Sequence, residues 1–220
     1  MAIKSFNITV CASGGGGNFR SLAKHQFDCG YRISLLVVDR ECFAIDVAKE
    51  YGIPYTVLYR KFLNKSFFEE FEKVIPVDTS LIVLAGFLPI IPKWICEKWE
   101  RRIINIHPSL LPEYGGKGMY GVKVQEAVLR NHEKYAGCTV HYVDEGIDTG
   151  EIIIQKRIFV AEDESAWELG GRVFNEEIKL LPLAVKKIRE EQLRFALDAV
   201  SDMKPSPLVS ICCLTYNHAP

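Results

Sequence analysis

The sequence predicts an α/β protein with a Rossmann-like, mainly parallel twisted sheet and flanking helices, and two observations support this fold class. First, short apolar runs alternate along the chain with amphipathic segments, which is the pattern of consecutive βαβ units. Second, the apolar run 6–12 leads directly into the glycine-rich segment 13–18, as in the strand-to-helix turns of nucleotide-binding sheets. The 220 residues suffice for one such domain with a sizeable buried core.

The first half of the chain is expected to alternate strands with helices. Short apolar runs bounded by turn residues predict strands, and apolar residues recurring every three or four positions predict helices. The expected strands are residues 6–12, 33–38, 81–85 and 103–106. The expected helices are residues 18–26, 43–51, 65–74 and 92–99.

The second half begins with residues 108–121, which are too rich in proline and glycine to form either element. The elements expected next are a helix at 122–131 and strands at 137–143 and 151–159, joined by a loop at 144–150. A long amphipathic helix, roughly residues 165–200, is expected to close the domain, with a break at Pro182.

A domain boundary is predicted at Lys204-Pro205-Ser206-Pro207. Residues 1–204 would form one domain, and residues 205–220 a linker and the start of a second, truncated one. Residues 208–217 have the apolar character of a buried strand, with no obvious partner. The alternative is a tail strand that pairs with the edge of the first sheet.

The composition excludes several classes of function. A net charge of −1 without a long basic run argues against a nucleic acid or an acidic membrane as partner. No run approaches the roughly 18 apolar residues of a membrane span. The seven cysteines include no C-x-x-C pair, which predicts reduced, structural thiols and a cytoplasmic location. No Cys or His spacing is typical of metal ligands, so no metal is predicted.

The first candidate site is the glycine-rich turn after the first strand: Ser13, Gly14, Gly15, Gly16, Gly17 and Asn18. Its backbone N–H groups can approach an anion at the start of a helix, where the helix dipole favours negative charge. The alternative is a tight turn without a ligand. A dinucleotide site fits less well, because the third glycine of that fingerprint falls on Phe19 or Arg20, although Asp39 keeps it open.

The second candidate is the pair Asn105 and His107 in the segment N-I-H-P-S-L-L-P. Alternation along a strand places both side chains on one face and Ile106 on the other. Pro108 ends the strand, so the pair lies at its carboxyl end, where open α/β sheets bind ligands. An amide beside an imidazole suits an oxyanion and a proton transfer. The alternative is a histidine that only satisfies the backbone.

The third candidate is Asp148, in the turn D-E-G-I-D-T-G between two apolar strands. Alone it is an ordinary acidic hairpin loop. It becomes functional if its carboxylate reaches His107 and orients the imidazole. His141, in the middle of a strand, is interpreted as structural, and His25 and His132 as surface residues of helices.

These motifs, with Leu84-Ala85-Gly86-Phe87-Leu88, resemble the folate-dependent formyltransferase family over residues 7–189. The resemblance implies formyl transfer from 10-formyltetrahydrofolate to a primary amine, with Asn105, His107 and Asp148 as catalytic residues. It implies that Asn105 and a protonated His107 stabilise the formyl oxygen. It also places the pterin ring between two loops, which contribute Leu84, Phe87, Leu88, Ile90, Ile91, Val143, Asp144, Glu145, Gly146 and Ile147. Pro89 stands where close relatives often carry a basic residue.

The acceptor is less clear from the sequence. The glycine turn and residues 114–121 resemble the glycinamide ribonucleotide branch of the family. Phe174, however, is apolar where that branch is expected to carry a polar contact, and residues 208–217 resemble the first strand of family 2-type glycosyltransferases.

The predicted acceptor is therefore the amine of a nucleotide-linked amino sugar in glycan biosynthesis, with fusion to a downstream glycosyltransferase-like domain. The residues expected to contact it are Ser13, Gly14, Gly15, Gly16, Gly17, Asn18, Ser109, Lys117, Met119 and Tyr120. The alternatives are glycinamide ribonucleotide as acceptor and a non-catalytic folate- or nucleotide-binding module.

Overall fold

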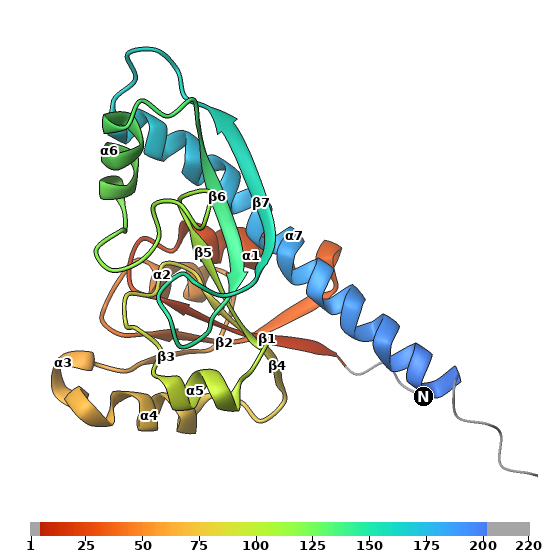
Figure 1. Ribbon diagram of the computed structural model, residues 1–220. Coiled ribbons are helices and arrows are strands. Elements are labelled where there is room, and N and C mark those ends of the chain that lie inside the picture. The colour runs from red at the N-terminus through yellow and green to blue at the C-terminus, as the bar shows by residue number, and fades with distance from the viewer. Residues whose placement is uncertain (1–4, 202–220) are drawn as a thin grey trace, which may run out of the picture.

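The computed structural model describes residues 5–201, with side chains up to Asp198. Its centre is a seven-stranded sheet in the order β3-β2-β1-β4-β5-β6-β7 (Figure 1). The strands β1 to β5 are parallel, and β6 and β7 continue the sheet as antiparallel neighbours. The strands are Phe6–Ala12, Tyr31–Val38, Tyr55–Val57, Thr79–Leu84, Ile103–His107, Tyr135–Tyr142 and Ile152–Phe159. The predicted Rossmann-like fold class is confirmed.

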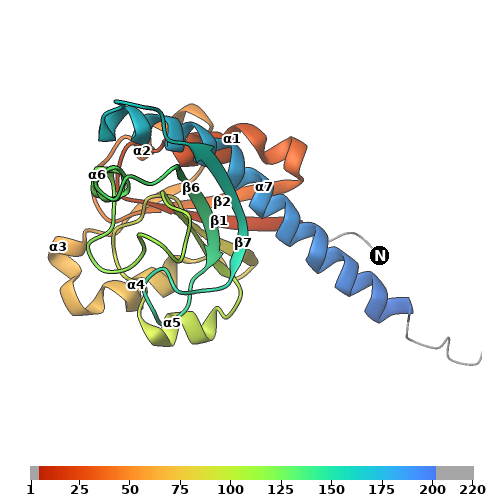
Figure 2. The same cartoon turned by 45° about the horizontal axis from the view of Figure 1, so that its top comes forward.

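Helices cover both faces of this sheet (Figure 2). Helices α1, α2 and α7 pack on one face and α4 and α5 on the other. The helices α1 to α7 are Gly17–Cys29, Ala44–Glu50, Arg60–Leu63, Phe67–Val74, Lys93–Lys98, Val122–Arg130 and Ala166–Ser201. A 3₁₀ turn, Asn64–Ser66, joins α3 to α4. The last turns of α7 project beyond the body of the domain (Figure 1).

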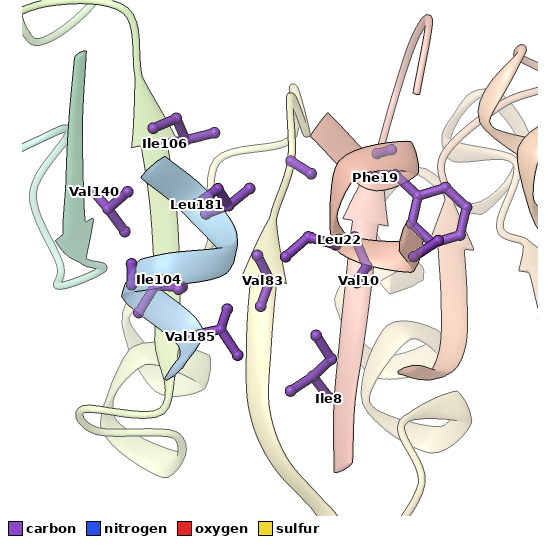
Figure 3. Close-up of a cluster of buried hydrophobic side chains, with 14 of the residues drawn as sticks. Ile8, Val10, Phe19, Leu22, Val83, Ile104, Ile106, Val140, Leu181 and Val185 are labelled. Atoms are coloured by element: carbon purple, nitrogen blue, oxygen red, sulfur yellow. The ribbon is translucent and has the colours of Figure 1, made fainter. Parts of the chain in front are cut away.

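The larger core lies between the sheet and the helices α1 and α7 (Figure 3). Ile104 and Ile106 of β5 point toward Leu181 and Val185 of α7, and Phe19 of α1 covers the neighbouring part of the sheet. All five side chains are at least 94% buried. Burial of such side chains contributes about 1.5–3 kcal/mol each, so α7 is held chiefly by this contact.

Most expected elements are present, with ends that differ by one to three residues, and β1 matches at both ends. The expected break at Pro182 is wrong, because α7 continues through it. Leu180 and Leu181 before the proline and Ala184 and Val185 after it are all buried, so packing on both sides outweighs the lost hydrogen bond. Strand β3 and helix α3 were not predicted, because three or four residues carry no readable period. His132 lies in the turn after α6 rather than on a helix.

Two sequence predictions concern other parts of the chain. The second domain predicted at residues 205–220, with its glycosyltransferase-like strand, lies outside the described residues. Within residues 5–201, no helix is both long and apolar enough to cross a membrane.

Candidate active site

Strand β5 presents Asn105 and His107 to a cavity at the edge of the sheet. Ile104 and Ile106 point the other way, into the core beneath α7, as Figure 3 shows. The predicted alternation is therefore confirmed. Pro108 follows His107 directly and ends the strand at the cavity wall. His107 is 4% exposed, so its imidazole forms its hydrogen bonds with protein groups rather than with solvent.

The loop after β6 brings Asp148 to His107. One Asp148 carboxylate oxygen, Oδ2, is 3.5 Å from His107 Nδ1 and accepts a 3.0 Å hydrogen bond from the Gly116 backbone N–H. On the other side of the ring, His107 Nε2 is 2.9 Å from the carbonyl oxygen of Tyr114. Both ring nitrogens thus face oxygen acceptors, and only a doubly protonated imidazole donates to both at once.

The backbone of loop 144–150 has a specific shape. Asp148 has φ 59°, a left-handed conformation that Asp adopts more readily than most residues. Asp144 Oδ1 accepts hydrogen bonds from Gly146 N at 3.0 Å and Thr149 Oγ1 at 2.7 Å. At position 150 a Cβ atom would lie 1.9 Å from the Tyr142 carbonyl oxygen, so only glycine fits there. These contacts define the turn that presents Asp148.

His141 belongs to the same cluster, although the sequence indicated a structural role. The β5–β6 ladder pairs His141 with Asn105, and His141 Nε2 is 3.2 Å from Asn105 Nδ2 and 3.7 Å from Asp148 Oδ1. Its Nδ1 lies 2.8 Å from the Tyr142 carbonyl oxygen, and burial lowers its pKa. A neutral ring with its hydrogen on Nδ1 accepts a hydrogen bond from the Asn105 amide and so fixes the orientation of that amide. Only the pairing register could have revealed this neighbour.

The cavity has a volume of about 950 Å³, and its lining includes residues of both predicted sites. Nine of the ten residues predicted to bind the pterin ring line it, namely Leu84, Phe87, Leu88, Ile90, Ile91, Val143, Asp144, Gly146 and Ile147. They form a mostly apolar slot with backbone polar groups, which fits a flat heteroaromatic ring. The tenth, Glu145, turns outward to Lys93, with Nζ and Oε2 2.5 Å apart. Pro89 also lines the slot.

The other end of the cavity contains four of the predicted acceptor residues: Asn18, Lys117, Met119 and Tyr120. Ser13 and Ser109 do not line it. The Ser13 hydroxyl accepts a hydrogen bond from Leu88 N, and the buried Ser109 hydroxyl donates to the Glu113 carbonyl oxygen. Gly14, Gly15, Gly16 and Gly17 surround the start of α1 beside Asn18 without lining the cavity themselves.

The acceptor end also contains polar groups of α6 and α7 that were not predicted. Glu177 is buried, accepts a 2.8 Å hydrogen bond from Asn18 Nδ2, and has a pKa raised by burial. Asn18 Oδ1 and Gln125 Oε1 are buried acceptors without a partner among the described residues. The sequence could not have identified Glu177 as a cavity residue. It reaches the cavity only because α7 docks on α1, and no local pattern around a single glutamate in a long helix indicates that contact. Within residues 5–201, no group of three or more His, Cys, Asp or Glu side chains could hold a metal ion.

Similar proteins identify the family. Residues 6–185 match the model of the family described as formyl transferase. The chain is 36% identical to the phosphoribosylglycinamide formyltransferase, chloroplastic, of Vigna unguiculata, over 91% of this chain and 66% of that protein. It therefore spans about two thirds of the length of this plant relative. The Bacillus subtilis phosphoribosylglycinamide formyltransferase is 35% identical over 82% of this chain and 93% of its own length.

A crystal structure of phosphoribosylglycinamide formyltransferase from Anaplasma phagocytophilum superposes with a TM-score of 0.78. The two chains are 35% identical, over 86% of this chain and 89% of that one.

These relatives overturn the amino-sugar acceptor predicted from the sequence, because proteins similar over most of the chain are named for phosphoribosylglycinamide. That prediction relied on ten tail residues outside the described part and on Phe174. The ring of Phe174 packs against Gly17, where an added Cβ atom would lie 2.4 Å away from it. The prediction of an enzyme that uses 10-formyltetrahydrofolate is confirmed at the level of the family. The chain belongs to the formyl transferase family.

Proposed function

We propose that the chain transfers the formyl group of 10-formyltetrahydrofolate to the primary amine of glycinamide ribonucleotide, the compound also called phosphoribosylglycinamide. The observation that carries the proposal is the cavity, because one lining combines the apolar residues of the slot, the polar side chains of Asn18, Gln125 and Glu177, and the trio Asn105, His107 and Asp148. The names of the relatives support this acceptor.

The polar end suits a phosphoribosyl group. The phosphate would lie at the start of α1, where Gly16 is the N-cap and no acidic residue occupies the first turn. A helix N-terminus of this kind favours an anion. The Glu177 carboxylate and the unpartnered Asn18 Oδ1 and Gln125 Oε1 are acceptors for ribose hydroxyl groups. The glycyl amine would then point toward Asp148.

Catalysis would depend on the negative charge that develops on the formyl oxygen. When bound, 10-formyltetrahydrofolate supplies the formyl carbon that the amine attacks. Asn105 has one amide hydrogen free for the oxygen, because the other points to His141 Nε2. A protonated His107 adds a positive charge, and its Nε2 hydrogen moves from the Tyr114 carbonyl to the formyl oxygen.

Asp148 would act through the imidazole and on the amine. Its carboxylate lies beside His107 Nδ1 and stabilises the charged ring. The proton lost by the attacking amine must reach the leaving nitrogen of the donor, through His107 or through a water molecule held at Asp148.

The acceptor can be tested directly by supplying 10-formyltetrahydrofolate with glycinamide ribonucleotide or with UDP- and dTDP-linked amino sugars. Release of tetrahydrofolate is the measurement. We expect kcat/KM for glycinamide ribonucleotide to exceed that for every amino sugar by at least about a hundredfold. In glycinamide ribonucleotide the amine and the ribose hydroxyls belong to one short unit, whereas a diphosphate separates the ribose of a nucleotide sugar from its amine, so the buried acceptors and the reacting centre cannot both be matched. Preferred turnover of an amino sugar would refute the proposal.

A pair of variants sharpens this test. Glu177→Gln should raise KM for glycinamide ribonucleotide about tenfold, because a carboxylate accepts ribose hydroxyls more strongly than an amide. KM for the donor should stay constant. Glu176→Gln is the matched control, because Glu176 pairs with the exposed Lys179 and does not line the cavity.

We also propose that the catalytic domain is complete by residue 204. The buried apolar residues of both described cores lie between Phe6 and Ile188. A chain cut after Lys204 should therefore keep the Tm of the 220-residue chain in differential scanning calorimetry. A marked fall in Tm would show that residues 205–220 belong to this domain. The relatives give no support for the predicted fusion to a glycosyltransferase.

The cytoplasmic location remains part of the proposal. The described part of the chain has five free cysteines, and four of them are buried. Thiols kept in this state fit a reducing compartment. The plant relatives are named as chloroplastic.

A further inference from the structure

The loop 144–150 carries Asp148 and is ordered by its own contacts. The Asp144 carboxylate ties Gly146 to Thr149, and at Gly146 an added Cβ atom would lie 2.0 Å from Thr149 Oγ1. A turn this tightly organised keeps its internal shape. Its internal contacts do not fix its position over β5, because a loop can shift as a unit relative to the strand that bears Asn105 and His107.

Few contacts join this loop to the catalytic strand. Among the hydrogen bonds and ion pairs of the described residues, Asp148 reaches Gly116 N and the imidazoles of His107 and His141. The two ion contacts are 3.5 and 3.7 Å long, at the outer limit of such interactions. They are also the interactions that catalysis would use. The ends of the loop are tied to the sheet, because Val143 N donates to the Ile103 carbonyl oxygen and Tyr142 N to that of Glu151, each at 2.9 Å. Support for the segment between these ends comes from another part of the fold.

Helix α5 and the turn after it supply that support, and the loop between β6 and β7 lies next to α5 in both views (Figures 1 and 2). At the start of the loop, Lys93 Nζ is 2.5 Å from Glu145 Oε2, and the Cys96 thiol donates to the Asp144 carbonyl oxygen at 3.1 Å. At its end, Arg101 forms an ion pair with Glu151.

The same Arg101 guanidinium lies over the Tyr142 ring, 4.5 Å from its centre. Residues 93–101 thus hold the chain both before and after the loop. The hydrogen bonds within the two ion pairs raise the pKa of Lys93 and lower that of Glu151, so both pairs stay charged at neutral pH.

We propose that residues 93–101 act as a strap for the loop, and that Lys93, Cys96 and Arg101 are positioning residues that keep Asp148 within reach of His107. The inference rests on the proposed role of Asp148. The side chains of Lys93 and Glu145 are 65% and 64% exposed, so their pairing contributes little to global stability. Its effect appears in catalysis, where a displacement of about 1 Å costs much of the rate.

The test reverses the charge of both anchors in the full chain. The double variant Lys93→Glu/Arg101→Glu places like charges beside Glu145 and Glu151, and we expect kcat to fall about tenfold. KM for the donor should rise, because Ile147 in the loop and Val143 before it line the slot, and KM for the acceptor should stay constant. Tm should remain near that of the unaltered chain. The quadruple variant, which adds Glu145→Lys and Glu151→Arg, restores both pairs and should restore kcat.

Two further readouts do not depend on the acceptor. Hydrogen–deuterium exchange of the peptide that contains residues 144–150 should accelerate in the double variant and return in the quadruple one. The affinity for 10-formylfolate, the oxidised form of the donor, should fall in the double variant and return in the quadruple one. Lys73→Glu is the matched control, because it breaks the Lys73–Glu70 pair on α4, away from the loop.

Unchanged exchange and unchanged kinetics in the double variant would overturn the strap, as would a quadruple variant that stays impaired. If the unaltered chain fails to formylate glycinamide ribonucleotide, the proposed acceptor is wrong. Exchange and 10-formylfolate affinity still decide the strap in that case.

Discussion

Replacement of His107 by asparagine is expected to lower kcat for formyl transfer by about three orders of magnitude. The variant loses the positive charge beside the formyl oxygen and the proton that Nε2 would donate, and each such effect is typically worth about 10²–10³-fold. The side chain is buried between Asp148 and the Tyr114 carbonyl, and asparagine fills part of that space with a polar group. The measurement is the steady-state release of tetrahydrofolate, with circular dichroism to verify the fold.

His132→Asn is the matched control for this variant. His132 lies in the exposed turn after α6 with φ 51°, a conformation that asparagine also adopts. It does not line the cavity, so its loss should leave kcat unchanged. If the His107→Asn enzyme kept more than about a tenth of the normal kcat, the imidazole would have no essential part in the reaction.

Conversion of Asp148 to asparagine should lower kcat about 10²–10³-fold while the donor still binds. The amide keeps the size of the side chain and tolerates the left-handed backbone, so the loop keeps its shape. It lacks the negative charge that, in the proposed mechanism, faces the His107 imidazole, and loss of an orienting carboxylate is typically severe. The Kd for 10-formylfolate, measured by calorimetric titration, should stay within about twofold, because the apolar slot is unchanged.

Asp163→Asn serves as the comparison, because Asp163 has the same φ of 59° but is exposed and does not line the cavity. It separates the effect of the backbone conformation from that of the charge at His107. A weakened donor affinity in Asp148→Asn, with kcat intact, would mean that Asp148 organises the slot rather than the reaction.

The features that the sequence predicted well depend on local patterns. Strand β1 and the alternation of Asn105 and His107 about Ile106 follow from a period of two, which neighbouring residues alone determine. The predicted break at Pro182 was wrong because the effect of a proline is not decided by its neighbours in the sequence alone. Its effect depends on the burial of Leu181 and Val185 against the sheet, and a distant surface provides that burial.

The proposed catalytic trio of Asn105, His107 and Asp148 follows from motifs, but its surroundings do not. His141 joins it through the register between β5 and β6, and Glu177 reaches the acceptor end because α7 docks on α1. Both contacts join positions that are far apart in sequence, about which a local pattern says nothing. The acceptor prediction was wrong because it depended on ten tail residues and on Phe174, whereas the family match covers residues 6–185.

The contact between Gly17 and Phe174 couples amino-acid substitutions at these two positions. With the phenylalanine in place, an added Cβ atom at position 17 would lie 2.4 Å from its ring, closer than carbon atoms approach without one of them moving. A side chain at 17 therefore requires either that the Phe174 ring, which is 40% exposed, swings away or that a smaller residue stands at 174. A mutational path that alters position 174 first avoids this displacement. Among homologues, the two positions are expected to covary although they lie 157 positions apart in the sequence.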